Sequence, residues 1–341
     1  MKFKIQYSTG GSLEPTPTEI QFDNDSLREA VREWLNNESD AIQKYGHISN
    51  WDVSQVTNMR KLFRNAEYFN EDITQWDVSG VTAMSHMFSG ANAFNQNIGG
   101  WDVSQVTTMH DMFLKAWNFN QDISEWNVSQ VKDMEGMFNG AINFNQDINT
   151  KEVTRSDGTT YVAWDVSQVK NMHNMFKDAT AFNKDIGEWN VSNVRDMTGM
   201  FYKAEDFNQD IRKWNVSQVR DMDVMFYGAR AFNQDIGQWP MGQYINTGYM
   251  FDHSGMSAKT FKGIYGARIA DHFDLEDSKQ DVVMEPYTRW ERKKNAVTLM
   301  SGLNRKDREG TLSTPQELRR MVFNPDDIGR KVASYLGGSK N

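Results

Sequence analysis

Residues 101–125 read WDVSQVTTMHDMFLKAWNFNQDISE, and this stretch decides the fold because it recurs along the chain. The repeated pattern is W-[DN]-V-S-x-V-x-x-M-x-x-[ML]-F-x-x-A-x-x-F-N-x-[DN]-I-x-x, and its tryptophans follow one another every 25 residues, with one longer step of 38. Repetition at this period predicts an array of similar units stacked in one direction. We expect the core to contain the tryptophan of each unit: Trp51, Trp76, Trp101, Trp126, Trp164, Trp189, Trp214 and Trp239.

Each unit is expected to contain one strand and one helix. The alternation of apolar and polar residues around the tryptophan predicts a short strand. The apolar residues from Val81 to Ala91 then fall at i, i+3, i+6, i+7 and i+10, the spacing of a helical stripe, and Ser79 stands at the N-cap position. One such unit cannot bury its own apolar face, so equivalent side chains of successive units are expected to stack.

The motif W-D-V-S-x-V-T-x-M-x-x-M-F-x-x-A-x-x-F-N-x-D-I resembles the repeats of the BspA-like leucine-rich-repeat family, found in surface proteins and in proteins of mycoplasmas, protists and large DNA viruses. The resemblance covers about residues 45–255. It implies a role in binding or adhesion and no defined reaction. The expected fold class is therefore an α/β repeat solenoid, leucine-rich-repeat-like, with eight strand-plus-helix units and capping segments.

Residues 1–46 are expected to cover the first open face of the array, as the end of a solenoid requires. Two strand-like pieces, residues 3–7 and 20–22, precede an amphipathic helix. Its apolar stripe runs from Leu27 to Leu35, and Asp25 or Ser26 is the expected N-cap. A partner-binding helix is the alternative interpretation.

The repeats are expected to occupy residues 47–258, with an insertion at about 149–162. Two β-prone segments flank Ser-Asp-Gly there, which predicts a hairpin. Insertions in repeat arrays often lie on the binding face, so Arg155 and Asp157 are candidate partner-binding residues, with a neutral loop as the alternative. Residues 259–341 are expected to form a mainly helical tail, whose segment 324–338 faintly resembles the first helix of an F-box.

A column of polar residues follows the tryptophans, one in each of seven units. Strand alternation would turn these residues away from the core, onto an exposed face that is acidic in its N-terminal half. We expect either a partner-binding surface for a basic protein or a solvated polar cover. The column consists of Asp52, Asp77, Asp102, Asn127, Asp165, Asn190 and Asn215.

A second polar column comes from the F-N-x-[DN]-I end of the unit. These side chains are expected to form an internal ladder that satisfies turn amides between helix and strand, and calcium binding through oxygen ligands is the alternative. The Asn members are Asn70, Asn95, Asn120, Asn145, Asn183, Asn208 and Asn233; the members two residues later are Asp72, Asn97, Asp122, Asp147, Asp185, Asp210 and Asp235.

Composition restricts the function classes further. The 341 residues include no cysteine, which excludes disulfides and thiolate sites, and a net charge of −9 disfavours nucleic-acid binding. His86, His110 and His173 are scattered along the chain between apolar residues, and we expect them to face solvent. No catalytic motif stands apart from the repeat. We therefore expect no catalytic residues, no metal, no cofactor and no small-molecule ligand.

These observations favour a non-enzymatic protein–protein interaction scaffold. The expected role is a structural or assembly component, including a minor particle protein of a large DNA virus, bound to a basic, shell or scaffold protein. The alternatives are an F-box-like ubiquitin-ligase substrate adaptor and a surface adhesion protein. With no signal peptide, lipid-anchor cysteine or apolar span in the sequence, an intracellular or virion location without membrane insertion is expected.

Overall fold

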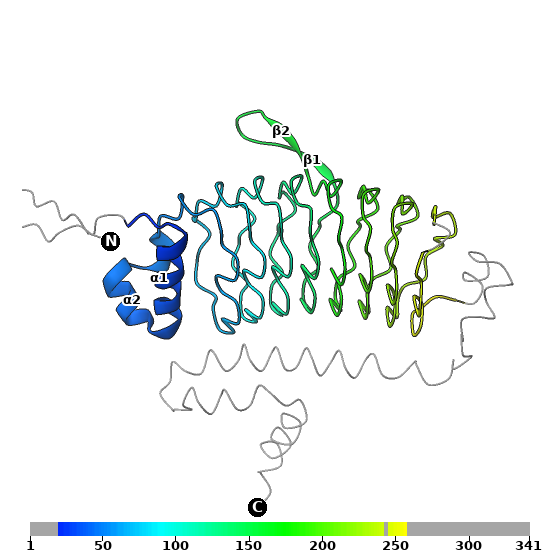
Figure 1. The fold of residues 1–341 in the computed structure, drawn as a ribbon, viewed down its shortest axis with the longest axis horizontal. Coiled ribbons are helices and arrows are strands. Elements are labelled where there is room, and N and C mark those ends of the chain that lie inside the picture. Colours follow the sequence, from blue (N-terminus) through cyan, green and yellow to red (C-terminus); the bar gives the residue numbers. More distant parts are fainter. Residues whose placement is uncertain (1–19, 242–244, 258–341) are drawn as a thin grey trace, which may run out of the picture. The chain divides into compact units, whose positions relative to one another are not determined.

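A computed structural model of the chain describes residues 20–241 and 245–257 as two helices followed by a series of stacked coils (Figure 1). The strand-like piece predicted at 3–7 and the tail predicted at 259–341, including the segment 324–338, lie outside the described residues. None of the helices within the described ranges has the length and apolar character required to span a membrane.

Each repeat forms one coil built from turns, so the predicted strand-plus-helix unit is wrong. Neighbouring coils are joined by single parallel bridges at one position of every unit, as between Asn58 and Ala83 and between Ala83 and Thr108. Within the described residues, regular elements are confined to α1 (Asn24–Asn36), α2 (Glu38–Tyr45), the 3₁₀ helix η1 (Ile48–Asn50), β1 (Lys151–Thr154) and β2 (Thr160–Ala163).

The backbone of residues 84–91 explains why the expected helix does not form. Alternate amides in this segment donate to carbonyl groups of the next coil at N···O distances of 2.7–3.2 Å. The amides of Met87, Ser89 and Ala91 donate three residues back at 3.0–3.2 Å. The backbone is left-handed at His86 (φ 57°) and Gly90 (φ 73°), which an α-helix does not allow. The apolar spacing of three and four residues therefore arises from consecutive tight turns.

The core is one continuous cluster that runs through all the coils. All eight repeated tryptophans are buried, with exposed fractions of 0–5%, which confirms the core prediction. Equivalent rings stack from coil to coil, as in Trp164 and Trp189 with ring centroids 6.1 Å apart. From the second unit onward, each indole N–H donates to an isoleucine carbonyl oxygen of the preceding coil at 2.8–3.3 Å.

The predicted amphipathic helix is confirmed as α1, but its N-cap is Asp23. The Asp23 carboxylate accepts from the amides of Asp25 and Ser26, and the Ser26 hydroxyl accepts from the Asp23 amide, which completes a capping box. Its stripe packs into the core next to the first coil, where Trp34 meets Trp51 edge-on at 5.8 Å. Leu35, expected in the stripe, is 43% exposed.

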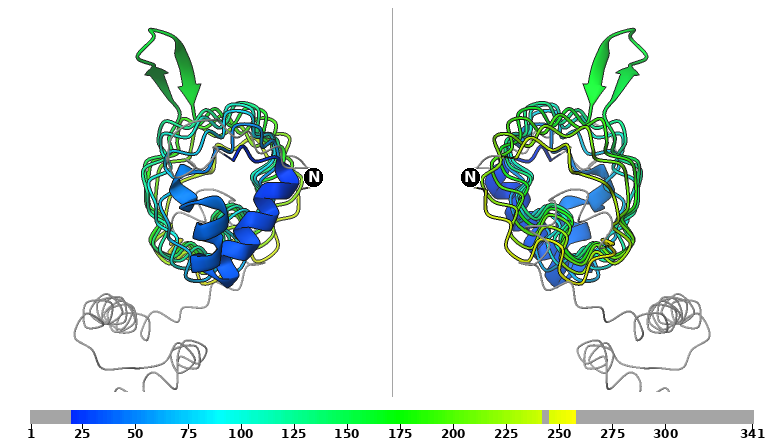
Figure 2. Two further views of the ribbon diagram at one scale, coloured as in Figure 1. Left: turned by 90° about the vertical axis from the view of Figure 1, so that its left-hand side faces the viewer. Right: turned by 90° about the vertical axis from the view of Figure 1, so that its right-hand side faces the viewer.

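The predicted hairpin is also confirmed. Strands β1 and β2 pair antiparallel from Lys151 opposite Ala163 to Thr154 opposite Thr160. The stacking continues across the insertion, because the Trp164 amide donates to the Trp126 carbonyl oxygen at 3.1 Å. Figure 2, in which the coils are seen end on, shows the hairpin projecting outward from them.

Candidate partner-binding site

The column of residues that follows the tryptophans lies on turns, so the strand face expected for it is not present. In every member, Oδ1 accepts a hydrogen bond from the amide of the serine two residues later, at 3.0–3.2 Å. This local bond closes a turn and gives the residues a structural role. All seven side chains are nevertheless exposed or half-buried, so together they still form a polar column on the surface.

The hairpin is fastened to this column through Tyr161 and Arg155. The Tyr161 hydroxyl donates to the Glu125 carbonyl oxygen at 2.6 Å, and the Arg155 guanidinium lies over the Tyr161 ring at 4.7 Å. Arg155 Nη2 also lies 3.8 Å from Asp102 Oδ2. The structure therefore brings together two candidate residues, Arg155 and Asp102, that are far apart in the sequence.

A shallow recess of about 170 Å³ lies between the hairpin and the column. Asp102, Asn127, Glu125, Arg155 and Tyr161 are among the residues that line it. Sites for small molecules usually enclose roughly 300–1,000 Å³, so this recess is smaller than a typical small-molecule site.

Asp157 lies at the exposed tip of the hairpin, away from the recess. Hydrogen bonds from the Thr159 hydroxyl and from the Thr159 amide lower the pKa of the Asp157 carboxyl below its ordinary value. The carboxylate thus shapes the turn and is charged at neutral pH. The recess is not lined by the other predicted members of the surface, which are Asp52, Asp77, Asp165, Asn190 and Asn215.

The second polar column has the internal role that the sequence predicts. Each asparagine from Asn70 to Asn208 accepts, through Oδ1, a hydrogen bond from the amide of the equivalent asparagine one coil later, at 2.8–3.0 Å. The companion residues, from Asp72 to Asp235, accept from amides two residues later at 2.8–3.1 Å. One oxygen of each side chain is therefore engaged in the backbone of the stack.

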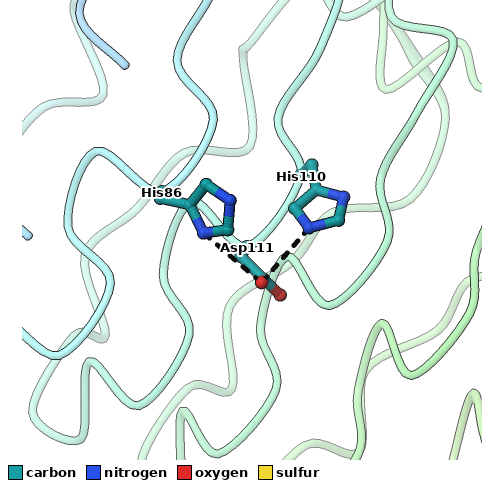
Figure 3. Close-up of side chains that lie close together, drawn as sticks. All are labelled: His86, His110 and Asp111. Atoms are coloured by element: carbon teal, nitrogen blue, oxygen red, sulfur yellow. Dashed lines mark ion pairs between the residues drawn. The ribbon is translucent and has the colours of Figure 1, made fainter. Parts of the chain in front are cut away.

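The prediction that the histidines are scattered and solvent-facing is wrong for His86 and His110. These two side chains lie on adjacent coils with ring centroids 4.9 Å apart, and only 17% and 27% of their side-chain surfaces are exposed (Figure 3). The repeat spacing could have predicted that these two histidines are neighbours, because residues about 25 apart lie side by side when coils stack. The role of Tyr161, whose hydroxyl fastens the hairpin to the Glu125 carbonyl oxygen, was not predicted from the sequence.

Comparison with known proteins gives one match. The family described as "Mycoplasma protein of unknown function, DUF285" matches residues 33–151 and again residues 150–263, which together include all eight repeated tryptophans. No match was found among curated proteins or among solved structures. The family description assigns no function, and mycoplasmas are one of the groups in which the repeat was expected. Because the two matches together cover more than half of its residues, the chain belongs to the DUF285 family, with two copies of that family's domain in succession.

Proposed function

We propose that the chain is a non-enzymatic protein–protein interaction scaffold. Its recognition site is the β1–β2 hairpin together with the polar column beside it. The observation that carries this proposal is the anchored hairpin: residues 156–160 are all exposed, while Arg155 and Tyr161 on either side of them hold the hairpin on the coils. A surface loop that is both exposed and fixed in place loses little conformational entropy on binding.

The hairpin is separable from the architecture that carries it. The coils before and after the insertion stack directly, with Phe138 and Phe176 ring centroids 5.6 Å apart and Trp164 bonded to Trp126. The thirteen extra residues are therefore not required for the stack. This independence supports a role for them in recognition, since loops on a rigid framework are the usual carriers of binding.

The charge of the column favours a basic partner. Asp52, Asp77 and Asp102 occupy successive coils on the N-terminal side of the hairpin. Arg155 approaches only the last of these, so the other two keep their carboxylates available to a cationic surface. A partner held in this way should associate faster at low ionic strength than at high ionic strength.

The resemblance to BspA-like leucine-rich repeats supports the same use of the molecule, because such repeats present equivalent positions of successive units as one binding surface. On this basis we place the chain among structural or assembly components that bind a shell or scaffold protein. No described residue favours the ubiquitin-ligase adaptor or the adhesion alternative.

Crosslinking mass spectrometry in the native source tests the proposal. The variant that lacks residues 151–163 is the matched control, because it joins Ile148-Asn149-Thr150 directly to Trp164 and restores the I-x-x-W spacing of the other units. We expect crosslinks from lysines of the coils beside the hairpin to one protein partner, and the loss of these crosslinks in the deletion variant. An unchanged crosslink pattern in the deletion variant would refute the proposed site.

A further inference from the structure

Two histidines and one aspartate converge on a single point between adjacent coils. His86 Nδ1 lies 3.4 Å from Asp111 Oδ2, and His110 Nε2 lies 3.3 Å from the same oxygen (Figure 3). The three donor atoms all lie within 4.8 Å of one another. Imidazole nitrogen and carboxylate oxygen are two of the three ligand types that zinc prefers in proteins.

The two shorter distances match the edges of a metal coordination sphere. Ligands about 2.0–2.1 Å from a tetrahedral zinc ion are separated from one another by about 3.4 Å. Direct charge-assisted hydrogen bonds between these groups would be shorter, roughly 2.7–2.9 Å. The side chains are therefore spaced as they would be around a shared cation, and a small rotation of the rings would close the third edge.

Two carboxylates also lie on the other side of the His110 ring, next to Nδ1. His110 Nδ1 faces Asp133 Oδ2 at 3.6 Å and Glu135 Oε2 at 3.7 Å, both from the following coil. The negative charge of these carboxylates favours the proton on Nδ1, which leaves the lone pair of Nε2 for a metal ion. This pairing of a ligand histidine with an outer carboxylate is typical of zinc sites in proteins.

A glycine in the next coil makes room for the Asp111 carboxylate. The Asp111 carboxylate projects toward the next coil over Gly136, where a Cβ atom would collide with Asp111 Oδ1. The glycine therefore leaves room for this carboxylate beside the two imidazoles.

We propose that His86, His110 and Asp111 form a binding site for one divalent transition-metal ion of the zinc class, with water in the fourth position. The ion joins the coil of residues 76–100 to the coil of residues 101–125. Asp133 and Glu135 act as positioning residues for His110.

His173 supplies the internal control. It occupies the same unit position as His110 and approaches a carboxylate, with His173 Nδ1 3.9 Å from Asp196 Oδ1. The residue that stacks beside it in the preceding coil is Gly136, so no second imidazole comes from that coil. His173 therefore represents a surface histidine beside a single carboxylate. If His86, His110 and Asp111 form a metal site, they should bind Zn²⁺ and His173 should not.

The test is calorimetric titration of the untagged full chain with ZnCl₂ after removal of metal by a chelator. We expect one ion per chain, with His86→Asn, His110→Gln and Asp111→Asn each lowering the affinity by at least about 100-fold, the upper end of what loss of an outer partner costs. Asp133→Asn should lower it about tenfold, and His173→Gln should leave it unchanged. Failure of the wild-type chain to bind Zn²⁺, or an equal loss in His173→Gln, would overturn the proposal.

A measurement on the wild-type chain avoids dependence on variants that fold poorly. Nuclear magnetic resonance of the imidazole nitrogens during Zn²⁺ addition should shift the His86 and His110 signals at one equivalent, with His173 unaffected. Equal shifts of all the histidine signals would indicate unspecific binding and contradict the site. This result is independent of the proposed partner-binding role, because the two surfaces share no residue.

Discussion

Replacing Trp126 by phenylalanine measures how much one indole contributes to the free energy of unfolding through its contacts between coils. Trp126 is 1% exposed, its N–H donates to the Ile98 carbonyl oxygen at 3.1 Å, and its ring stacks on Phe113 at 6.3 Å. Phenylalanine keeps a stacking ring but removes the donor and part of the buried area. The Trp101 amide still donates to the same carbonyl, so no buried acceptor is left without a partner.

The expected magnitude follows from these two losses. The hydrogen bond contributes about 0.5–1.5 kcal/mol net, and the cavity left by the smaller ring adds a cost of about 1 kcal/mol. We therefore expect Trp126→Phe to lower the free energy of unfolding by about 2 kcal/mol, and Trp126→Ala by about 4–6 kcal/mol. Trp117→Phe is the matched control, because Trp117 is 39% exposed and its replacement should change the free energy by less than about 0.5 kcal/mol.

Urea unfolding followed by far-ultraviolet circular dichroism supplies the free energies, and hydrogen exchange with mass spectrometry locates the loss. In a stack of nearest neighbours, protection should fall most in residues 101–125 and 164–188, on either side of the altered coil, and least in the distant coils. If Trp126→Phe were no more destabilising than Trp117→Phe, or if protection fell evenly along the chain, the reasoning about interlocked coils would be refuted.

Three further predictions concern the insertion, the backbone and a histidine. Deleting residues 151–163 should leave the thermal unfolding midpoint unchanged or raised, because the deletion removes the need for a left-handed backbone at Trp164 (φ 50°). A large fall of the midpoint would show that the hairpin supports the stack. The backbone is left-handed at Val224 (φ 51°) and at Gly199 (φ 60°). Val224→Asn should therefore stabilise the chain by about 1 kcal/mol, and Gly199→Ala should destabilise it by at least as much. Equal effects of the two substitutions in urea unfolding would argue against a left-handed backbone at these positions. In chelator-treated buffer the free energy of unfolding should fall as the pH drops from about 6.5 to about 4. The reason is that folding lowers the pKa of His86 from 6.5 to about 4, so the unfolded ring takes up its proton first. His86→Asn should flatten this fall, and an unaltered pH profile in that variant would contradict the prediction.

The sequence was sufficient to predict the repeat, its buried tryptophans, the helix α1 and the hairpin. Each of these depends on a local pattern: a 25-residue period, an apolar stripe from Leu27, or turn residues between two β-prone segments. The internal asparagine ladder was also predictable, because a polar residue repeated in register must meet its equivalents when units stack.

The expected helices failed because tight turns and an α-helix can place apolar residues at the same intervals. The residue types at two positions of each unit distinguish tight turns from an α-helix. Gly90, Gly140 and Gly228 share one of these positions, and Gly136 and Gly199 share the other, where a left-handed backbone is required. Glycines recurring at fixed places inside a supposed helix argue against it.

The candidate sites were predictable only in part, because they form between units. Arg155 was chosen from its place in the insertion, yet its approach to Asp102 depends on how the hairpin returns to the stack. His86, His110 and Asp111 looked unrelated along the chain, since pairing them requires knowing which positions of adjacent coils face each other.

The most direct test of the central claim is to place a photo-crosslinking amino acid at Asp157, on the hairpin tip, and at Tyr68 as a control that is 62% exposed. Both variants are expressed in the native source and irradiated at low and high salt. The account predicts one specific protein adduct at position 157 that weakens at high salt, and no such adduct at position 68. The same adducts at both positions, or none at position 157, would contradict the claim that the hairpin and the acidic column recognise a protein partner.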